Sequence, residues 1–145
     1  MSFRLSKDIF NTPTVLVPCA NTFTGAKGSL VMADTANNIM IAATSASTVA
    51  NLFGVINKTV VSGETSVEVI PIVSGPGQTW EADMTNNTAA DQLLERAALS
   101  NSTSVNNTGT TVAGPTGVWT SLVAVGAAAD KKTLGYFNVT GQVTA

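Results

Sequence analysis

Histidine is absent from this chain of 145 residues, and cysteine occurs once, at Cys19. Without an imidazole the chain has no Ser-His-Asp or Cys-His arrangement and no histidine-containing zinc site. A single cysteine forms no disulfide within the chain and no thiolate cluster for a metal. We therefore expect no enzyme, no metal site and no cofactor. A Ser-Lys or Thr nucleophile needs no histidine and stays open as an alternative, although no Ser-X-X-Lys motif occurs.

Charge is also scarce, at 11% of residues, with seven Lys and Arg against nine Asp and Glu. The basic residues are scattered, and only Lys131 and Lys132 are adjacent, so the basic stripe of a nucleic-acid binder is missing. No apolar run reaches the roughly 20 residues of a membrane span. The sequence therefore predicts neither nucleic acid nor a membrane as partner.

Small neutral residues take the place of charge. The chain contains 21 Thr, 12 Ser, 12 Asn and 19 Ala, yet 44% of its residues are hydrophobic. Disordered chains usually combine low hydrophobicity with high net charge, which is the opposite pattern. The abundant Thr and Val favour strands, so we expect a folded, strand-rich domain.

The chain divides at Pro13 into a predicted extended N-terminal arm (residues 1–13) and a β-rich domain (residues 14–145). Apolar, β-branched runs separated by turn signals such as Gly75-Pro76-Gly77 predict strands at 14–19, 29–33, 38–43, 52–57, 66–73, 79–84, 118–125 and 133–139. Strands at such short spacing predict an all-β fold, a small antiparallel β-barrel or sandwich.

One short α-helix is expected at 89–99, which is rich in helix formers and follows the cap candidates Asn86, Asn87 and Thr88. Its Leu93, Leu94, Ala97 and Ala98 would form one apolar stripe facing the core. The Ser, Asn, Thr and Gly of residues 100–117 predict a low-complexity loop.

Candidate chemistry is limited to a few side chains. Glu81 and Asp83 share one face of the strand at 79–84, where they could bind calcium or act as acid and base, but a polar strand face is the favoured interpretation. Cys19 lies at the end of an apolar strand, and this position favours a buried and unreactive thiol. Trp80 and Trp119 are expected in the core, and a stacking platform for sugars is the alternative.

The order of several segments resembles the decoration, or cement, proteins that coat the capsids of tailed bacteriophages. The resemblance covers residues 14–139 and rests on low charge, on strand order and on the segments Leu52-Phe53-Gly54-Val55-Ile56, Val67-Glu68-Val69-Ile70-Pro71-Ile72, Thr79-Trp80-Glu81-Ala82-Asp83 and Leu134-Gly135-Tyr136-Phe137-Asn138-Val139. It implies a structural virion protein on the capsid surface that binds the major capsid protein, stabilises the shell and forms a homo-oligomer. No catalytic residues come with that family.

The predicted arm supplies the candidate capsid contacts. Phe3, Leu5, Ile9 and Phe10 are its apolar anchors, and an extended arm can add to a partner's sheet through main-chain hydrogen bonds. A frayed terminus is the competing interpretation. Other hypotheses are a head-fibre or tail-tube component, and a secreted module that binds glycans or a host surface through Trp80 and Trp119.

Overall fold

The computed structural model describes residues 3–108, 112 and 114–140, and these residues form two antiparallel sheets. In spatial order, the six-stranded sheet contains β1 (Arg4–Asp8), β7 (Gln78–Asp83), β11 (Lys132–Phe137), β10 (Trp119–Ala124), β8 (Arg96–Asn101) and β9 (Ser104–Asn106). The five-stranded sheet contains β2 (Val15–Pro18), β6 (Ser66–Pro71), β5 (Leu52–Ile56), β3 (Leu30–Asp34) and β4 (Ile39–Ala42).

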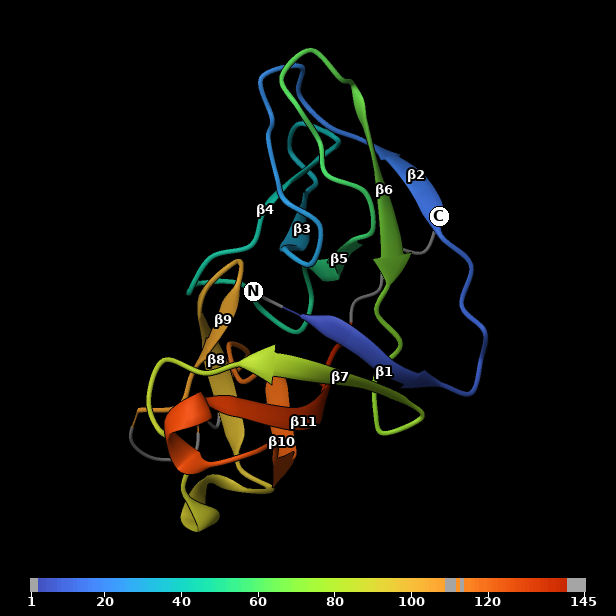
Figure 1. Cartoon of the computed structure of the whole chain (residues 1–145). Coiled ribbons are helices and arrows are strands. Elements are labelled where there is room, and N and C mark those ends of the chain that lie inside the picture. The colour runs from blue at the N-terminus through green and yellow to red at the C-terminus, as the bar shows by residue number, and fades with distance from the viewer. Residues whose placement is uncertain (1–2, 109–111, 113, 141–145) are drawn as a thin grey trace.

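The two sheets lie one above the other, with the five-stranded sheet in the upper half of Figure 1. Each sheet curls. A bridge between Met84 and Val105 joins the end of β7 to β9, and a bridge between Cys19 and Met40 joins the end of β2 to β4. Because these are single bridges rather than full strand pairings, neither sheet closes into a barrel. The fold is nearly all-β and sandwich-like, as one of the two predicted architectures requires.

Two hydrophobic cores result from this arrangement. The larger core lies between the sheets and contains Leu52, Val55, Trp80, Trp119 and Phe137 among its buried residues. The smaller core lies within the curl of the five-stranded sheet and contains Val31, Phe53, Ile56, Val67 and Val69.

Strand β5 contributes to both cores, and all five of its residues are buried. Gly54 is required where β5 pairs with β6, since a Cβ built on it would lie 2.7 Å from the backbone oxygen of Ile70. The continuous apolar run of β5 is therefore explained by burial on both faces.

The α-helix predicted at 89–99 is wrong. Ala90–Gln92 form a single 3₁₀ turn, η1, and β8 begins at Arg96. Leu94 has a φ of 66°, which ends any helical path. The Arg96 side chain then donates to the Gly117 oxygen from Nε at 2.9 Å and from Nη2 at 2.7 Å, and β8 pairs with β10. Strand pairing with a distant segment has overridden local helix propensity.

The low-complexity loop predicted at 100–117 also contains more structure than expected. Residues 104–106 form β9, which pairs back onto β8 as a hairpin. Residues 109–111 and 113 lie outside the described part of the chain. No helix in the described part is long and apolar enough to cross a membrane.

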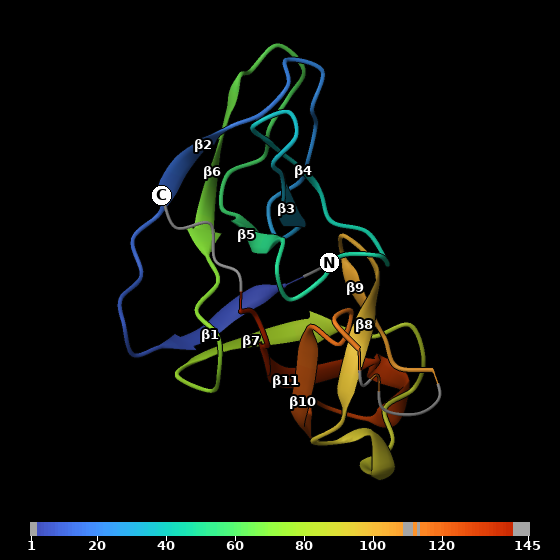
Figure 2. The ribbon, with the colours of Figure 1, turned by 180° about the vertical axis from the view of Figure 1, so that it is seen from behind.

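Much of the predicted N-terminal arm is a strand of the domain. Residues 4–8 form β1, which pairs antiparallel with β7 at the edge of the six-stranded sheet. Figure 2 shows β1 lying alongside β7 beneath the five-stranded sheet. These residues do not form the predicted extended arm, because β7 offers an open edge with which they pair and Phe3 is buried in the core beside it.

Candidate contact surface

The structure separates the four predicted contact residues into two groups. Phe3 is only 2% exposed and packs against Trp119 and Phe137, so its role as an exposed anchor is corrected to that of a core residue. Leu5, Ile9 and Phe10 are 41%, 63% and 53% exposed. These three side chains remain available to a partner.

Ile9 and Phe10 form an exposed pair on the turn that follows β1, here called the apolar turn. The Ile9 nitrogen donates to the Gly77 oxygen at 3.0 Å, which ties the turn to the β6–β7 connection. A Cβ built on Gly77 would lie 2.7 Å from Phe10 Cε2 and 3.2 Å from Ile9 Cδ1. The side chains of Ile9 and Phe10 therefore pack over Gly77, in space that a larger residue at position 77 would occupy.

Asp8 holds the backbone of the apolar turn. Its carboxylate accepts hydrogen bonds from the Phe10 nitrogen and the Thr12 nitrogen, each at 2.9 Å. Burial alone would raise the pKa of Asp8, but the hydrogen bonds from Thr12, Phe10 and Gln78 outweigh it and lower this pKa. The ionised carboxylate is thus the form that the folded turn prefers.

Acid is therefore expected to weaken the fold through Asp8. A carboxyl whose pKa is lowered by folding contributes stability above its unfolded pKa of about 3.9, and this contribution is lost as pH falls through the folded pKa. Wild-type protein should exceed Asp8→Asn in free energy of unfolding at about pH 6, and the difference should shrink below about pH 4. Denaturant titrations across this range measure it, and a difference independent of pH would contradict the role of the charge.

Glu81 and Asp83 lie on one strand face, as predicted, but within an ion-pair network. Arg4 bonds to Glu81 and lies 3.9 Å from Asp83, and Lys132 Nζ donates to Asp83 Oδ1 at 2.7 Å. Burial alone would raise the pKa of Asp83, but groups that include the Lys132 ammonium lower it. These carboxylates tie β1 and β11 to β7.

The other residues considered for chemistry, Cys19, Trp80 and Trp119, are buried. Cys19 is buried, and burial together with the charge of Glu64 raises the pKa of its thiol, as expected for an unreactive cysteine. Trp80 and Trp119 are 1% and 0% exposed, so the core interpretation is confirmed and neither indole offers a stacking platform. Across residues 3–108, 112 and 114–140, no three acidic or cysteine side chains gather as metal ligands.

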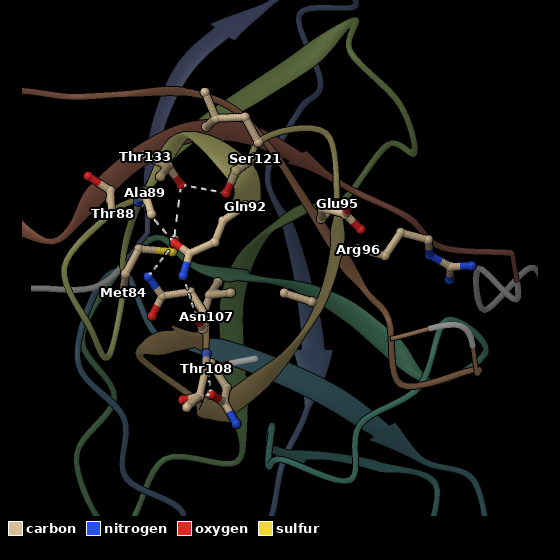
Figure 3. Close-up of a pocket in the computed structure, with 14 residues that line it drawn as sticks. Met84, Thr88, Ala89, Gln92, Glu95, Arg96, Asn107, Thr108, Ser121 and Thr133 are labelled. Carbon is tan, nitrogen blue, oxygen red and sulfur yellow. Dashed lines mark hydrogen bonds between the residues drawn. The ribbon is translucent and has the colours of Figure 1, made fainter. Parts of the chain in front are cut away.

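A small cavity lies inside the curl of the six-stranded sheet, beneath η1 (Figure 3). Its volume is about 30 Å³, close to the share of one water molecule in the liquid. Its polar lining is bonded within itself: Gln92 Nε2 donates to the Asn107 oxygen at 2.8 Å, and the hydroxyls of Ser121 and Thr133 lie 2.9 Å apart. A cavity of this size admits no organic substrate.

The residues that support the apolar turn were not predicted from the sequence. Asp8, followed two and four residues later by backbone donors, is a local pattern typical of a side chain that caps a turn. Gly77 was assigned to a turn, but its contact with Phe10 joins residues 67 positions apart and leaves no local signal.

A scan against protein families and a search of curated proteins find no match to this chain.

Proposed function

We propose that this protein is a structural virion protein that binds the outer surface of a tailed-phage capsid and stabilises the shell. The observation that carries the proposal is the apolar turn, because the fold holds two large apolar side chains outward on a fixed backbone. Such a preorganised pair can enter a partner's pocket with little loss of conformational freedom. The segment resemblance supplies the kind of partner, the major capsid protein.

The remaining surface fits adhesion better than catalysis. Charge is sparse, the candidate carboxylates are ion-paired and the two indoles lie in the core. A protein repeated over a lattice gains avidity from many modest contacts and needs neither a deep pocket nor strong charge. Burial of both indoles argues against the alternative of a glycan-binding platform.

Substitution of the apolar turn is the direct test. The double variant Ile9→Ser and Phe10→Ser should bind roughly 100-fold more weakly to undecorated capsids, because two apolar side chains lose their burial at the interface. Cosedimentation with capsids assembled from the major capsid protein of the same genome measures the loss. Point substitutions are preferable to deletion of residues 1–13, which would also remove Phe3 and β1 from the fold.

Val61→Ser is the matched control, since Val61 is 58% exposed and lies away from β1 in the sequence. It should bind as the wild type does. Equal binding by the double variant would overturn the role of the apolar turn. If the purified chain instead assembles unaided into long tubes, a tail-tube component becomes the better assignment.

A further inference from the structure

The five-stranded sheet has a gap between its two edge strands. The sheet curls until β2 and β4 approach each other, but within the described residues the bridge between Cys19 and Met40 is the one pairing that joins them. A pocket of about 360 Å³ opens at this gap, and its lining comes from β2, β3, β4 and β5. This volume falls within the range of pockets that hold small molecules, about 300–1,000 Å³. The pocket is here called the β2–β4 pocket.

The apolar part of the lining is open to solvent. Val17, Ala33 and Ile39 are partly exposed, and Met40 and Phe53 keep 7% and 8% of their surface exposed. Met40 and Phe53 also belong to the smaller core. The β2–β4 pocket is therefore a place where the smaller core reaches the surface. An apolar group bound there would extend that core without displacing any of its members.

The polar part of the lining is confined to one segment, the end of β3 and the turn that leads to β4. This segment contributes Asp34, Thr35 and Asn38. The β2–β4 pocket is therefore amphipathic, with apolar walls from the strands and polar groups at the hairpin turn. Such a division orients a bound molecule that has one polar end.

Asp34 gives the polar end of the β2–β4 pocket a negative charge. It is partly buried, and its Oδ2 accepts a hydrogen bond from Asn37 Nδ2 at 2.8 Å. In the described part of the chain, no Lys or Arg pairs with Asp34, whereas Glu81 and Asp83 are both ion-paired. A carboxylate beside an apolar pocket attracts a cation more strongly than one in open water, because the effective dielectric constant is lower. Charge complementarity therefore selects a cationic ligand.

We propose that the β2–β4 pocket binds a small amphipathic amine, with its ammonium group paired with Asp34 and its apolar body against Val17, Met40 and Phe53. A primary ammonium group has three donors for the carboxylate and for the oxygen atoms of the turn. A carboxylic acid of the same shape is disfavoured, because it places a second negative charge beside Asp34. This inference does not rest on the capsid proposal, since the site shares no residue with the apolar turn.

Titrations with three probes of one shape test the charge preference. Phenethylamine, phenethyl alcohol and phenylpropionate share a phenyl ring on a two-carbon chain and differ in the polar end. Phenethylamine should bind about 5-fold more tightly than the alcohol, as expected for a partly exposed ion pair, and phenylpropionate should bind more weakly than the alcohol. NMR of isotope-labelled protein measures the affinities, and the shifted resonances should cluster at β2, the β3–β4 hairpin and β5. Equal affinity for the three probes, or no saturable binding of the amine, would overturn the proposal.

Asp34→Asn removes the charge and keeps an oxygen that accepts from Asn37. It should weaken phenethylamine binding about 5-fold and leave phenethyl alcohol binding unchanged, a difference that a general effect on folding would not produce. Asp91→Asn is the matched control, because Asp91 is exposed and lies outside the lining, and it should bind both probes as the wild type does. An equal effect of Asp34→Asn on both probes would contradict the pairing with the ammonium group.

Ala33→Leu tests the location of the site by filling the β2–β4 pocket. Both phenethylamine and phenethyl alcohol should bind roughly 10-fold more weakly, because the added side-chain atoms occupy the space of the apolar body. Ala124→Leu makes the same change at an exposed position of β10 and should keep the wild-type affinities. Thermal unfolding shows that each variant is folded. Undiminished binding by folded Ala33→Leu would place the amine elsewhere and overturn the proposal.

Discussion

Phe137→Ala should lower the free energy of unfolding by about 3–5 kcal/mol, the usual cost of truncating a buried aromatic residue. Phe137 is 0% exposed and is the ring that the other core aromatics share. Its centroid lies 5.0 Å from Trp119, 5.3 Å from Phe3 and 6.0 Å from Trp80. The truncation therefore opens a cavity at the point where β1, β7, β10 and β11 meet.

Denaturant unfolding followed by tryptophan fluorescence measures this loss, and the native emission should shift because both indoles touch Phe137. Since domains are typically stable by about 5–15 kcal/mol, the variant should lose a large fraction of its stability. Phe10→Ala is the matched control, because Phe10 is 53% exposed. Equal losses in the two variants would contradict the placement of the core.

Gln78→Met should cost about 3–5 kcal/mol, because it leaves one buried and two partly buried polar groups without their partner. Gln78 is 0% exposed. Its Oε1 accepts from the Val73 nitrogen at 2.8 Å and from Trp80 Nε1 at 3.2 Å, and its Nε2 donates to the Pro71 oxygen at 3.1 Å. One amide thus joins the end of β6 to β7 across the two sheets.

Gln78→Glu separates these bonds from side-chain volume. It keeps the two acceptor bonds, but an ionised carboxylate would face the Pro71 oxygen and the Asp8 carboxylate, so folding should raise the pKa of the new group. A group whose pKa is raised by folding contributes its full stability below its unfolded pKa of about 4.3. This contribution is lost as pH rises through the folded pKa. The stability deficit relative to wild type should therefore grow between about pH 5 and pH 8. A constant deficit would argue against a bond from Gln78 to Pro71.

The strands were predictable wherever their side chains alternate or are buried on both faces. At 79–84 the two-residue period assigned Trp80, Ala82 and Met84 to one face, and they are 1%, 0% and 4% exposed. The segment at 66–73 shows the limit of that approach. Val67 and Val69 enter the smaller core and Ile72 enters the larger one, and only the position of β6 between two cores explains this.

The elements that were wrong depend on partners far away in the sequence. Residues 89–99 have good helix propensity, but β8 is stabilised by pairing with β9 and β10. Residues 4–8 contain Arg4, Lys7 and Asp8 and resemble a terminal arm until β7 is available to pair with them. Neither pairing can be predicted from the local sequence of the strand concerned.

The contact surface was predictable in part for the same reason. Ile9 and Phe10 are apolar residues in a polar segment, which identified them directly. Phe3 has the same local appearance, and only the positions of Trp119 and Phe137 distinguish it as a core residue. Whether the exposed pair contacts a capsid stays a prediction.

The burial of Phe3 against Phe137 has a consequence for synthesis of the chain. The ribosome makes β1 before its partner strand, because β1 pairs with residues 78–81, and the neighbouring Phe3 packs against a ring 134 positions later. At about 5–20 residues per second, that ring follows Phe3 by about 7–27 s. The larger core therefore closes only after Phe137 has been synthesised, and until then the nascent chain exposes apolar side chains that chaperones can bind.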